Sequence, residues 1–547
     1  MPIPVYSGSF GKPQLLHLLR RTLFGVTKAD LAAFSGQSLS QVVTSLLADL
    51  PAPAPPLVDY TDAAATGTTT GTAPRNWVYP GIPTGQTWVN DKQTDNRIYN
   101  PSRERSTRRW WAILKLRQDR NIREKMVLFW QNHIPTEIGQ SVTEGFHFYA
   151  YQRVVRQYAV GNFKDLVRQL TIEPAMLVYL DGEDNRYIVN GNGVNENYAR
   201  ELQELFCIGK DFSPSYTQDD VVAAAKVLSG FQRSDSYLGT TDPNNQYNDY
   251  THKFTLSRHD PTNKTFSSFY NNTIINGSTD PTGMTEVNAL LDMIFAHPEV
   301  ARFVVRKLYR FFVYYTIDAT IESDVIVPLA NTFRSNNYDI KPVLAELLSS
   351  QHFFDSLKST GAVIKNPVDY CIGLARTMGF YGTNAIPYNV ASGFDSHLTN
   401  QQMRPGSPPN VAGWPAYYQT PNYHELWINA ETLRRRKEFV DRLISVGIGS
   451  GNPKVDVLAF TRTLDTPANP DLLIAEVVEL LHVAPPDAAV TAQLKSILLS
   501  GQTADYYWSD AWNSYITTPT TANTNTVQTR LQTLYVAILN TAECHLM

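Results

Sequence analysis

Charged residues are scarce in this chain of 547 residues. Lysine, arginine, aspartate and glutamate make up 18% of it, against about a quarter in an average globular domain. Asn, Thr, Ser, Gln and Tyr take their place. The formal net charge is −4, so the chain lacks the basic excess that binds phosphate backbones. We therefore expect no nucleic-acid partner.

Cysteine is rarer still: Cys207, Cys371 and Cys544 lie far apart along the chain. Three widely spaced cysteines form neither a disulfide framework nor a zinc-binding motif. Cys207 falls late in an expected helix. We interpret it as a small core or boundary residue, and the alternative is a reactive thiol.

Long apolar runs and an export signal are also missing. No apolar stretch reaches the length that crosses a bilayer, which predicts no transmembrane segment. The start of the chain, MPIPVYSGSFGKPQLLHLLRR, has no charged segment followed by an apolar one. As written it is not a signal peptide, so the sequence alone favours a cytoplasmic protein.

Common catalytic and metal-binding motifs are absent as well. The chain contains no G-x-S-x-G, no G-x-G-x-x-G and no P-loop. HELW (424–427) has Ile428 where the zinc motif H-E-x-x-H needs its second histidine. LDGEDNRYIVNG (180–191) lacks the glycine and the glutamate of an EF-hand, since Arg186 and Asn192 stand there.

We therefore predict no metal site and no cofactor. The alternative is a divalent cation outside the EF-hand pattern, held by Asp181, Glu183 or Asp184, because carboxylates are suitable ligands for such ions.

Most of the chain has the apolar periodicity of helices, as in IREKMVLFWQNHI and YTQDDVVAAAKVLSGF. Residues 51–75 are rich in Pro, Ala, Thr and Gly and are expected to form a loop. Residues 232–285 are rich in Asn, Asp, Gly, Tyr and Ser, and HKFTLSRH within them alternates like a strand. We predict a mainly α, single-domain assembly with a core from 1–231 and 286–547 and a loop and β-hairpin insertion at 232–285.

The clearest expected helix is NENYARELQELFCIG, residues 195–209. Asn195 is a suitable N-cap, and Gly209 is suitable just past the end. At about 100° per residue, one apolar stripe forms from Tyr198, Leu202 and Leu205, with Phe206 beside it. This stripe is expected to face the core.

The polar side of this helix carries Glu196, Arg200 and Glu204, each four residues from the next. They are expected to form a ladder of ion pairs. Glu201 instead lies at the margin of the apolar stripe, where partial burial would raise its pKa and prepare it as a general acid. The alternative is that Glu201 pairs with a nearby Arg, Tyr or backbone amide.

Two further segments carry candidate chemistry, each with an alternative. In FWQNHIPTE (129–137), His133 follows Trp130 at a helix end; it could act as a base or ligand, or cap the helix as a cation. In SRHDPTNKTF (257–266), His259, Asp260 and Lys264 could serve proton transfer or anion binding, or form a solvated turn.

A third segment, RPGSPPNVAGWP (404–415), is a proline-rich loop that contains Asn410 and ends beside Trp414. An ordered aromatic loop of this kind can stack on a sugar, and the alternative is that it plugs the core.

Taken together and in order, several segments resemble the bacterial family of domain of unknown function 1800. They are HLLRRTLFG, FWQNHI, NENYARELQELFCIG, YTQDDVVAAAKVLSGF, HDPTNKTF, HPEVARFVVRKLYRFFV and RPGSPPNVAGWP, and the resemblance covers about residues 10–440. It implies a mainly helical protein that is commonly exported and often encoded beside a sulfatase-like protein of family 1501. The family has no settled activity.

The resemblance places the hallmark of the family on the 195–209 helix. It also aligns a His-Asp-x-x-x-Lys element with His259, Asp260 and Lys264, and a Pro-Pro-Asn-x-x-Gly-Trp-Pro element with residues 408–415. The chain departs from the family at Gln131, where a histidine is common, which argues against a two-histidine metal site. The export signal common in the family is not evident either, so the family favours an exported or periplasmic protein and the sequence does not.

Two functions follow as hypotheses. The first is a hydrolase or lyase that acts on a polar polymer such as a glycan, with Glu201 as general acid or base and Asp260 or Glu196 as the second carboxylate. His133 and His259 would assist. The residues expected to bind substrate are Arg200, Asn195, Lys264, Trp130, Asn410 and Trp414.

The second hypothesis is a non-enzymatic binding or assembly protein of the cell envelope, a partner of the sulfatase-like protein. In that case the motif residues form buried polar networks that fix loops on the helical core. The two hypotheses differ in one geometric requirement. The enzyme needs Glu201, His259 and Asp260 to meet at an open pocket, whereas side chains that are scattered, or buried and fully paired, would favour the binding protein.

Overall fold

The computed structural model describes residues 2–59, 82–89, 100–139, 141–142, 145–188, 193–210, 215–234, 252–359 and 363–547. The predicted loop at 51–75 lies outside these residues from position 60 onward. The described chain is mainly helical, with two small two-stranded sheets, which confirms the predicted fold class.

The first part of the fold is a series of helices. Their bounds are α1 Lys12–Thr22, α2 Lys28–Phe34, α3 Leu39–Leu46, α4 Asn100–Leu116, α5 Arg123–His133, α6 Gly145–Gln157, α7 Phe163–Thr171, α8 Pro174–Tyr179, α9 Asn197–Glu201 and α10 Gln218–Val227. Helix α10 begins as predicted at Thr217, whose hydroxyl accepts from the backbone N–H of Asp220.

Within the described residues, four strands lie in the insertion or at its start. They are β1 Phe231–Arg233, β2 His252–Phe254, β3 Lys264–Thr265 and β4 Ile274–Ile275, paired antiparallel as β1–β2 and β3–β4. The strand expected over 252–259 stops at Phe254, because a 3-10 turn over Leu256–Arg258 follows and bends the chain. Residues 235–251 of the insertion lie outside the described part.

Helices then continue to the end. They are α11 Met284–Ala296, α12 Glu299–Phe312, α13 Ala319–Ile321, α14 Val327–Ser335, α15 Ile340–Leu348, α16 Gln351–Ser359, α17 Pro367–Thr377, α18 Tyr388–Asn400, α19 Ala430–Asp441, α20 Val457–Arg462, α21 Pro470–Leu481, α22 Ala488–Leu498, α23 Tyr506–Thr517 and α24 Thr521–Leu539. The pair His297–Pro298 separates α11 from α12, since the residue before a proline disfavours helix.

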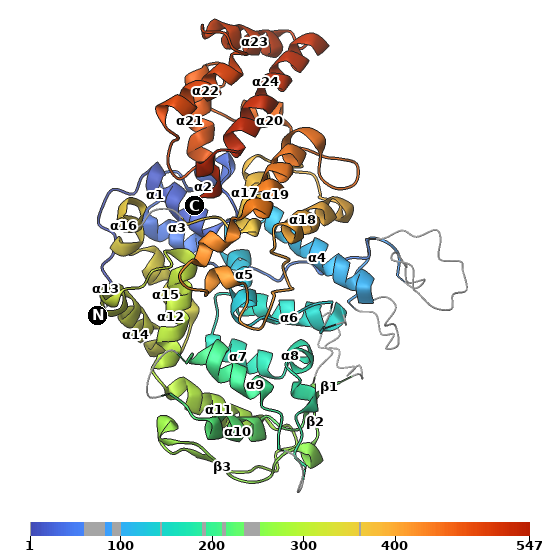
Figure 1. The fold of residues 1–547 in the computed structure, drawn as a ribbon, viewed down its shortest axis with the longest axis vertical. Coiled ribbons are helices and arrows are strands. Elements are labelled where there is room, and N and C mark those ends of the chain that lie inside the picture. The colour runs from blue at the N-terminus through green and yellow to red at the C-terminus, as the bar shows by residue number, and fades with distance from the viewer. Residues whose placement is uncertain are drawn as a thin grey trace, which may run out of the picture.

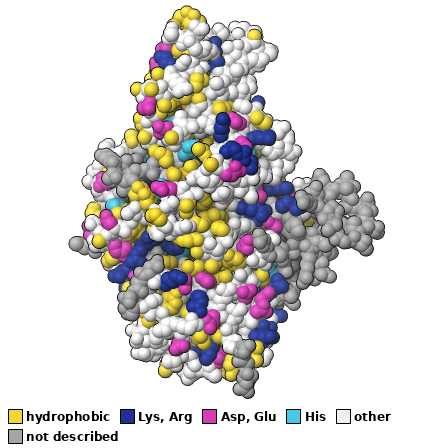
Figure 2. All heavy atoms as spheres, in the orientation of Figure 1, with side chains coloured by type: hydrophobic (Ala, Val, Ile, Leu, Met, Phe, Trp, Pro, Cys, Tyr) yellow, Lys and Arg dark blue, Asp and Glu magenta, His cyan; other side chains and the backbone are white. Residues whose placement is uncertain are grey.

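These helices form an elongated body with α20–α24 as a lobe at one end and the strands of the insertion near the other (Figure 1). One hydrophobic cluster runs through the molecule and includes residues from Ile3 to Cys544, so body and lobe share a core. On the face seen in Figure 2, hydrophobic side chains run down the middle, and acidic and basic side chains are interspersed around them.

The helix expected over 195–209 is regular only at its start. Asn195 accepts from the backbone N–H of Asn197 at 2.9 Å, but the N-cap of α9 is Glu196, one residue later than predicted, and its side chain makes no capping hydrogen bond. After α9 the chain continues as a π-helix over Leu202–Cys207 and ends at Gly209, whose φ is +84°. A π-turn fits one extra residue into the helix, so Phe206 and Cys207 are buried and Leu205 is only partly buried.

Candidate functional site

The polar side of the hallmark helix forms a small exposed network. Arg200 donates to Glu196 at 2.7 Å and to the side-chain oxygen of Gln218 at 2.9 Å, and Gln218 donates to Glu196 at 2.6 Å. The predicted pair Glu196–Arg200 is therefore present. The predicted pair Arg200–Glu204 is wrong, because Glu204 forms its ion pair with Lys210 beyond the π-turn.

Glu201 lies at the edge of the core, as the helical wheel predicts, and is half-buried. Burial, followed by repulsion from Glu204, raises the pKa of its carboxyl group. No hydrogen bond or ion pair joins this carboxylate to another residue in the described part of the chain.

Two tyrosines share the surroundings of Glu201. Burial, with the nearby charges of Glu137 and Glu201, raises the pKa of Tyr179 to about 12. Burial and the charges of Glu204 and Glu201 also raise the pKa of Tyr216, whose buried hydroxyl has no hydrogen-bond partner among the described residues. A carboxylate with a raised pKa is more readily protonated than an exposed one, which is the property a general acid needs.

His133 and Trp130 are buried beneath the hallmark helix rather than exposed at a site. The imidazole Nε2 of His133 lies 2.9 Å from the carbonyl oxygen of Phe206, and burial lowers its pKa well below the usual range. The residue is thus neutral and donates from Nε2, so the expected cationic helix cap is wrong. Trp130 has no exposed surface, and its indole N–H donates to the carbonyl of Ala159 at 2.9 Å.

The His259 segment forms a closed network around a carboxylate, Glu286. Nε2 of His259 lies 3.0 Å from one oxygen of Glu286, and Nζ of Lys264 lies 2.5 Å from the other. Lys264 also donates to the carbonyl of Asp260 at 2.6 Å. All four side chains are at most 3% exposed, so the expected alternative of a solvated turn is wrong.

Further contacts of this network join the insertion to the chain just after α10. Nδ1 of His259 lies 2.9 Å from the carbonyl of Ser229, and the Ser229 hydroxyl accepts from the backbone N–H of Asp260 at 2.9 Å. The Asp260 carboxylate accepts from the backbone N–H of Thr262 at 2.8 Å. Burial would raise the pKa of Glu286, but hydrogen bonds from His259 and Lys264 outweigh it and lower that pKa.

Sequence reasoning missed Glu286, although one signal was available. Glu286 stands one residue before Val287 and four before Leu290, both of which are fully buried. A glutamate on the apolar stripe of a helix needs a cation inside the core, and Lys264 and His259 supply it.

The proline-rich loop binds to the segment that contains His133. The backbone N–H of Trp414 donates to the side-chain oxygen of Asn132 at 2.9 Å, and Trp414 is 2% exposed. Gly413, with φ +87°, leaves room for this contact, since a Cβ there would lie 2.4 Å from Asn132. Asn410 is exposed and donates to the Tyr418 hydroxyl at 3.2 Å.

The structure therefore brings some candidate residues together and separates others. His259, Asp260 and Lys264 meet, and so do Glu196 and Arg200. No hydrogen bond or ion pair in the described residues joins Glu201 to His259 or Asp260. The catalytic and substrate-binding roles of all these candidate residues, and of Asn195, stay predictions.

The acidic loop near Asp181 has protein partners. The carboxylate of Asp181 accepts from the side-chain amide of Asn197 at 3.2 Å, and Glu183 forms an ion pair with Arg233 at 3.0 Å. Over the described residues, no group of three or more His, Cys, Asp or Glu side chains is arranged to hold a metal ion. Positions 189–192 of the loop lie outside that part.

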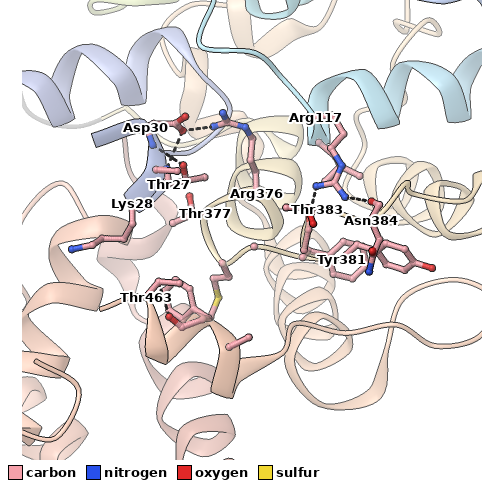
Figure 3. Close-up of a pocket in the computed structure, with 18 of the residues that line it drawn as sticks. Thr27, Lys28, Asp30, Arg117, Arg376, Thr377, Tyr381, Thr383, Asn384 and Thr463 are labelled. Carbon is pink, nitrogen blue, oxygen red and sulfur yellow. Dashed lines mark hydrogen bonds and ion pairs between the residues drawn. The ribbon is translucent and has the colours of Figure 1, made fainter. Parts of the chain in front are cut away.

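A pocket of about 1020 Å³ lies where the lobe meets the body (Figure 3). Its walls come from α2, the α4–α5 loop, the segment 378–385 and α20, and five cationic and three acidic side chains line it. Arg117 donates to the carbonyl of Gly382 at 2.6 Å and also to that of Asn384, which holds the 378–385 segment in place. Glu201 does not line this pocket.

Fold and contacts define a large helical protein whose motif residues mainly join its loops to one core. The chain belongs to the family described as Protein of unknown function (DUF1800), whose profile matches residues 17–541. No curated protein and no solved structure matches it. Over the described residues, no helix combines the length and the apolar character needed to cross a membrane.

Proposed function

We propose that this protein is a non-enzymatic binding or assembly protein. One observation supports this proposal most: the side chains of His133, His259, Asp260, Lys264 and Trp414 are buried, and they or their backbone groups bond to neighbouring segments. Groups that act on a polymer must reach it, whereas groups that hold loops on a core need not. The family motifs then maintain a rigid surface for a partner.

The pocket at the lobe junction is the binding site that we assign to this function. Its volume of about 1020 Å³ is that of a ligand site, and such sites favour junctions between folded units. Lys454 of this pocket is exposed and forms no ion pair within the described residues, which favours a partner segment that carries an acidic group. Tyr381, at φ +66°, lines this pocket, and such backbone strain is concentrated at functional sites.

The partner we propose is the sulfatase-like protein that the family resemblance implies, at the cell envelope. Purified protein and partner are mixed, and the complex is measured by light scattering and calorimetry. We expect a stoichiometric complex that Lys454→Glu, in the pocket, weakens by about fivefold. The matched control Lys437→Glu, an exposed lysine outside the pocket, leaves the affinity unchanged.

Two results would count against this function: no complex at micromolar concentrations, or equal effects of the two lysine variants. The first would reject the partner, and the second would reject the pocket as its binding site.

A second candidate function rests on Glu201. Its raised pKa, the two neighbouring tyrosines and the absence of a described hydrogen-bond partner support acid or base chemistry on a polar polymer such as a glycan. The test is turnover of a glycan panel by wild type and by Glu201→Gln. Turnover that Glu201→Gln abolishes and that the control Glu431→Gln, at an exposed glutamate on α19, retains would favour the enzyme, and turnover that survives Glu201→Gln would reject this role.

A further inference from the structure

A cluster of cations lies in the interior near the junction of body and lobe. It consists of Arg20 and Arg21 of α1, Lys125 of α5, Lys365 just before α17, and Arg436 of α19. Arg21, Lys125 and Arg436 are at most 4% exposed. Removing a charge from water is costly unless an opposite charge compensates it, so the counter-charges of this cluster need to be identified.

One buried carboxylate in the described chain compensates part of the cluster. Asp369 forms an ion pair with Lys125 and accepts from the side-chain amide of Asn366 at 2.6 Å. Glu479 lies near Arg20 but is 40% exposed and forms its ion pair with Lys12. The positive charges of Lys365, Arg21 and Arg436 are left without a carboxylate in contact.

Backbone carbonyls satisfy several donors of these side chains without neutralising their charge. Nζ of Lys365 donates to the carbonyls of Leu481, at 3.3 Å, and Cys544, at 2.8 Å. Arg436 donates to the carbonyl of Lys365 at 2.6 Å. An ammonium group has three donors, so one donor of Lys365 is unused.

The three arginines also have unused donors. The Nε atoms of Arg20, Arg21 and Arg436 are buried and have no hydrogen-bond partner. Burial lowers the pKa of Arg20 and Arg21 to about 10 and that of Lys365 to about 8. The cluster therefore has more hydrogen-bond donors than acceptors, and more positive charge than negative charge.

A cavity of about 30 Å³ adjoins these groups. Arg20 and Lys365 line it together with Asp369 and Thr377, and its other walls are mainly apolar, including Leu374 and Leu480. A volume of about 10–15 Å³ by this measure holds one water molecule, so this cavity has room for a single ion somewhat larger than water.

We propose that this cavity binds a small inorganic anion of the chloride class. The anion accepts from the unused donor of Lys365 and from Nε of Arg20, and it neutralises part of the cluster. The charge of Asp369 does not exclude it, because Lys125 compensates that carboxylate. The site is a different cavity from the pocket at the lobe junction, although Thr377 lines both.

The direct test is a crystal of the whole protein grown in sodium bromide. We expect an anomalous peak in the cavity within hydrogen-bond distance of Lys365 Nζ and Arg20 Nε. A cavity without a bromide peak would overturn the proposal.

The second test compares Tm in sodium chloride and in sodium gluconate at equal ionic strength. For an ion that binds only the folded state, we expect chloride to raise Tm by about 2 °C. Lys365→Met should lose this difference, and the control Lys437→Met, an exposed lysine on α19 outside the cavity, should keep it. Equal Tm values of the wild type in the two salts would contradict a stabilising anion.

Discussion

Glu286 and Glu201 are two carboxylates at the core of one molecule, and their surroundings are opposite. Glu286 is fully buried and held by His259 and Lys264, which lower its pKa. Glu201 is half-buried, has no described hydrogen-bond partner, and its pKa is raised. The same residue type thus serves as a paired structural group in one region and as an ionisable, accessible group in the other.

The largest effect should come from breaking the Glu286 network. Lys264→Met leaves a buried carboxylate without its strongest partner, and we expect a loss of about 3–5 kcal/mol in the free energy of unfolding, measured with urea. Lys253→Met, an exposed lysine on β2, is the control and should be nearly neutral. A loss below about 1 kcal/mol for Lys264→Met would show that Glu286 does not depend on this cation.

A smaller effect is expected at His133, which belongs to the closed region although it lies beneath the hallmark helix. His133→Leu removes the donor to the carbonyl of Phe206, and we expect a loss of about 1–3 kcal/mol. Because burial keeps the imidazole neutral, its NMR signals should not titrate between about pH 5 and pH 8. Titration in that range would place His133 with the accessible groups.

The dependence of stability on pH should also distinguish Glu201 from Glu286. The ordinary pKa of Glu201, 4.5, is raised in the folded state, so the folded state binds more protons just above that value. The stabilisation that the Glu201 carboxyl group contributes is therefore present below pH 4.5, and it is lost as the pH rises through the raised pKa. Glu201→Gln should therefore raise the free energy of unfolding at pH 7, by about 0.5 kcal/mol or less because the group is half exposed.

Glu286 should show the opposite sign. Its folded pKa is lowered, so its contribution is present above its ordinary pKa and is lost as the pH falls through the folded value. Tm measured from about pH 3 to pH 8 in wild type, Glu201→Gln and Glu286→Gln checks both signs. If the change in Tm with pH differed from wild type in the same direction for both variants, the distinction between the two regions would be refuted.

The smallest effect is expected at Arg200. Its bonds to Glu196 and Gln218 lie on the exposed side, so Arg200→Gln should cost only about 0.2–0.5 kcal/mol, measured by urea unfolding. A loss above about 1 kcal/mol would mean that this network is part of the core.

Local patterns in the sequence were sufficient for the helical fold and for the position of Glu201, because both follow from helical periodicity. They were insufficient where partners lie far apart. Lys264 and Glu286 are 22 residues apart, and Asn132 and Trp414 are 282 apart, so no spacing rule connects them. The π-turn after Glu201 also changed the expected pairing of Glu204, since 3.6-residue periodicity assumes an uninterrupted α-helix.

The capping carboxylate of α10 has a consequence for the order of folding. Asp220 caps its own helix with Thr217 and also accepts from the backbone N–H and hydroxyl of Ser267, 47 residues later. The local contact can form as soon as the helix does, whereas the distant one must wait for loop closure. The insertion is therefore expected to dock late, and weakening its contact with Asp220 should mainly speed unfolding rather than slow folding.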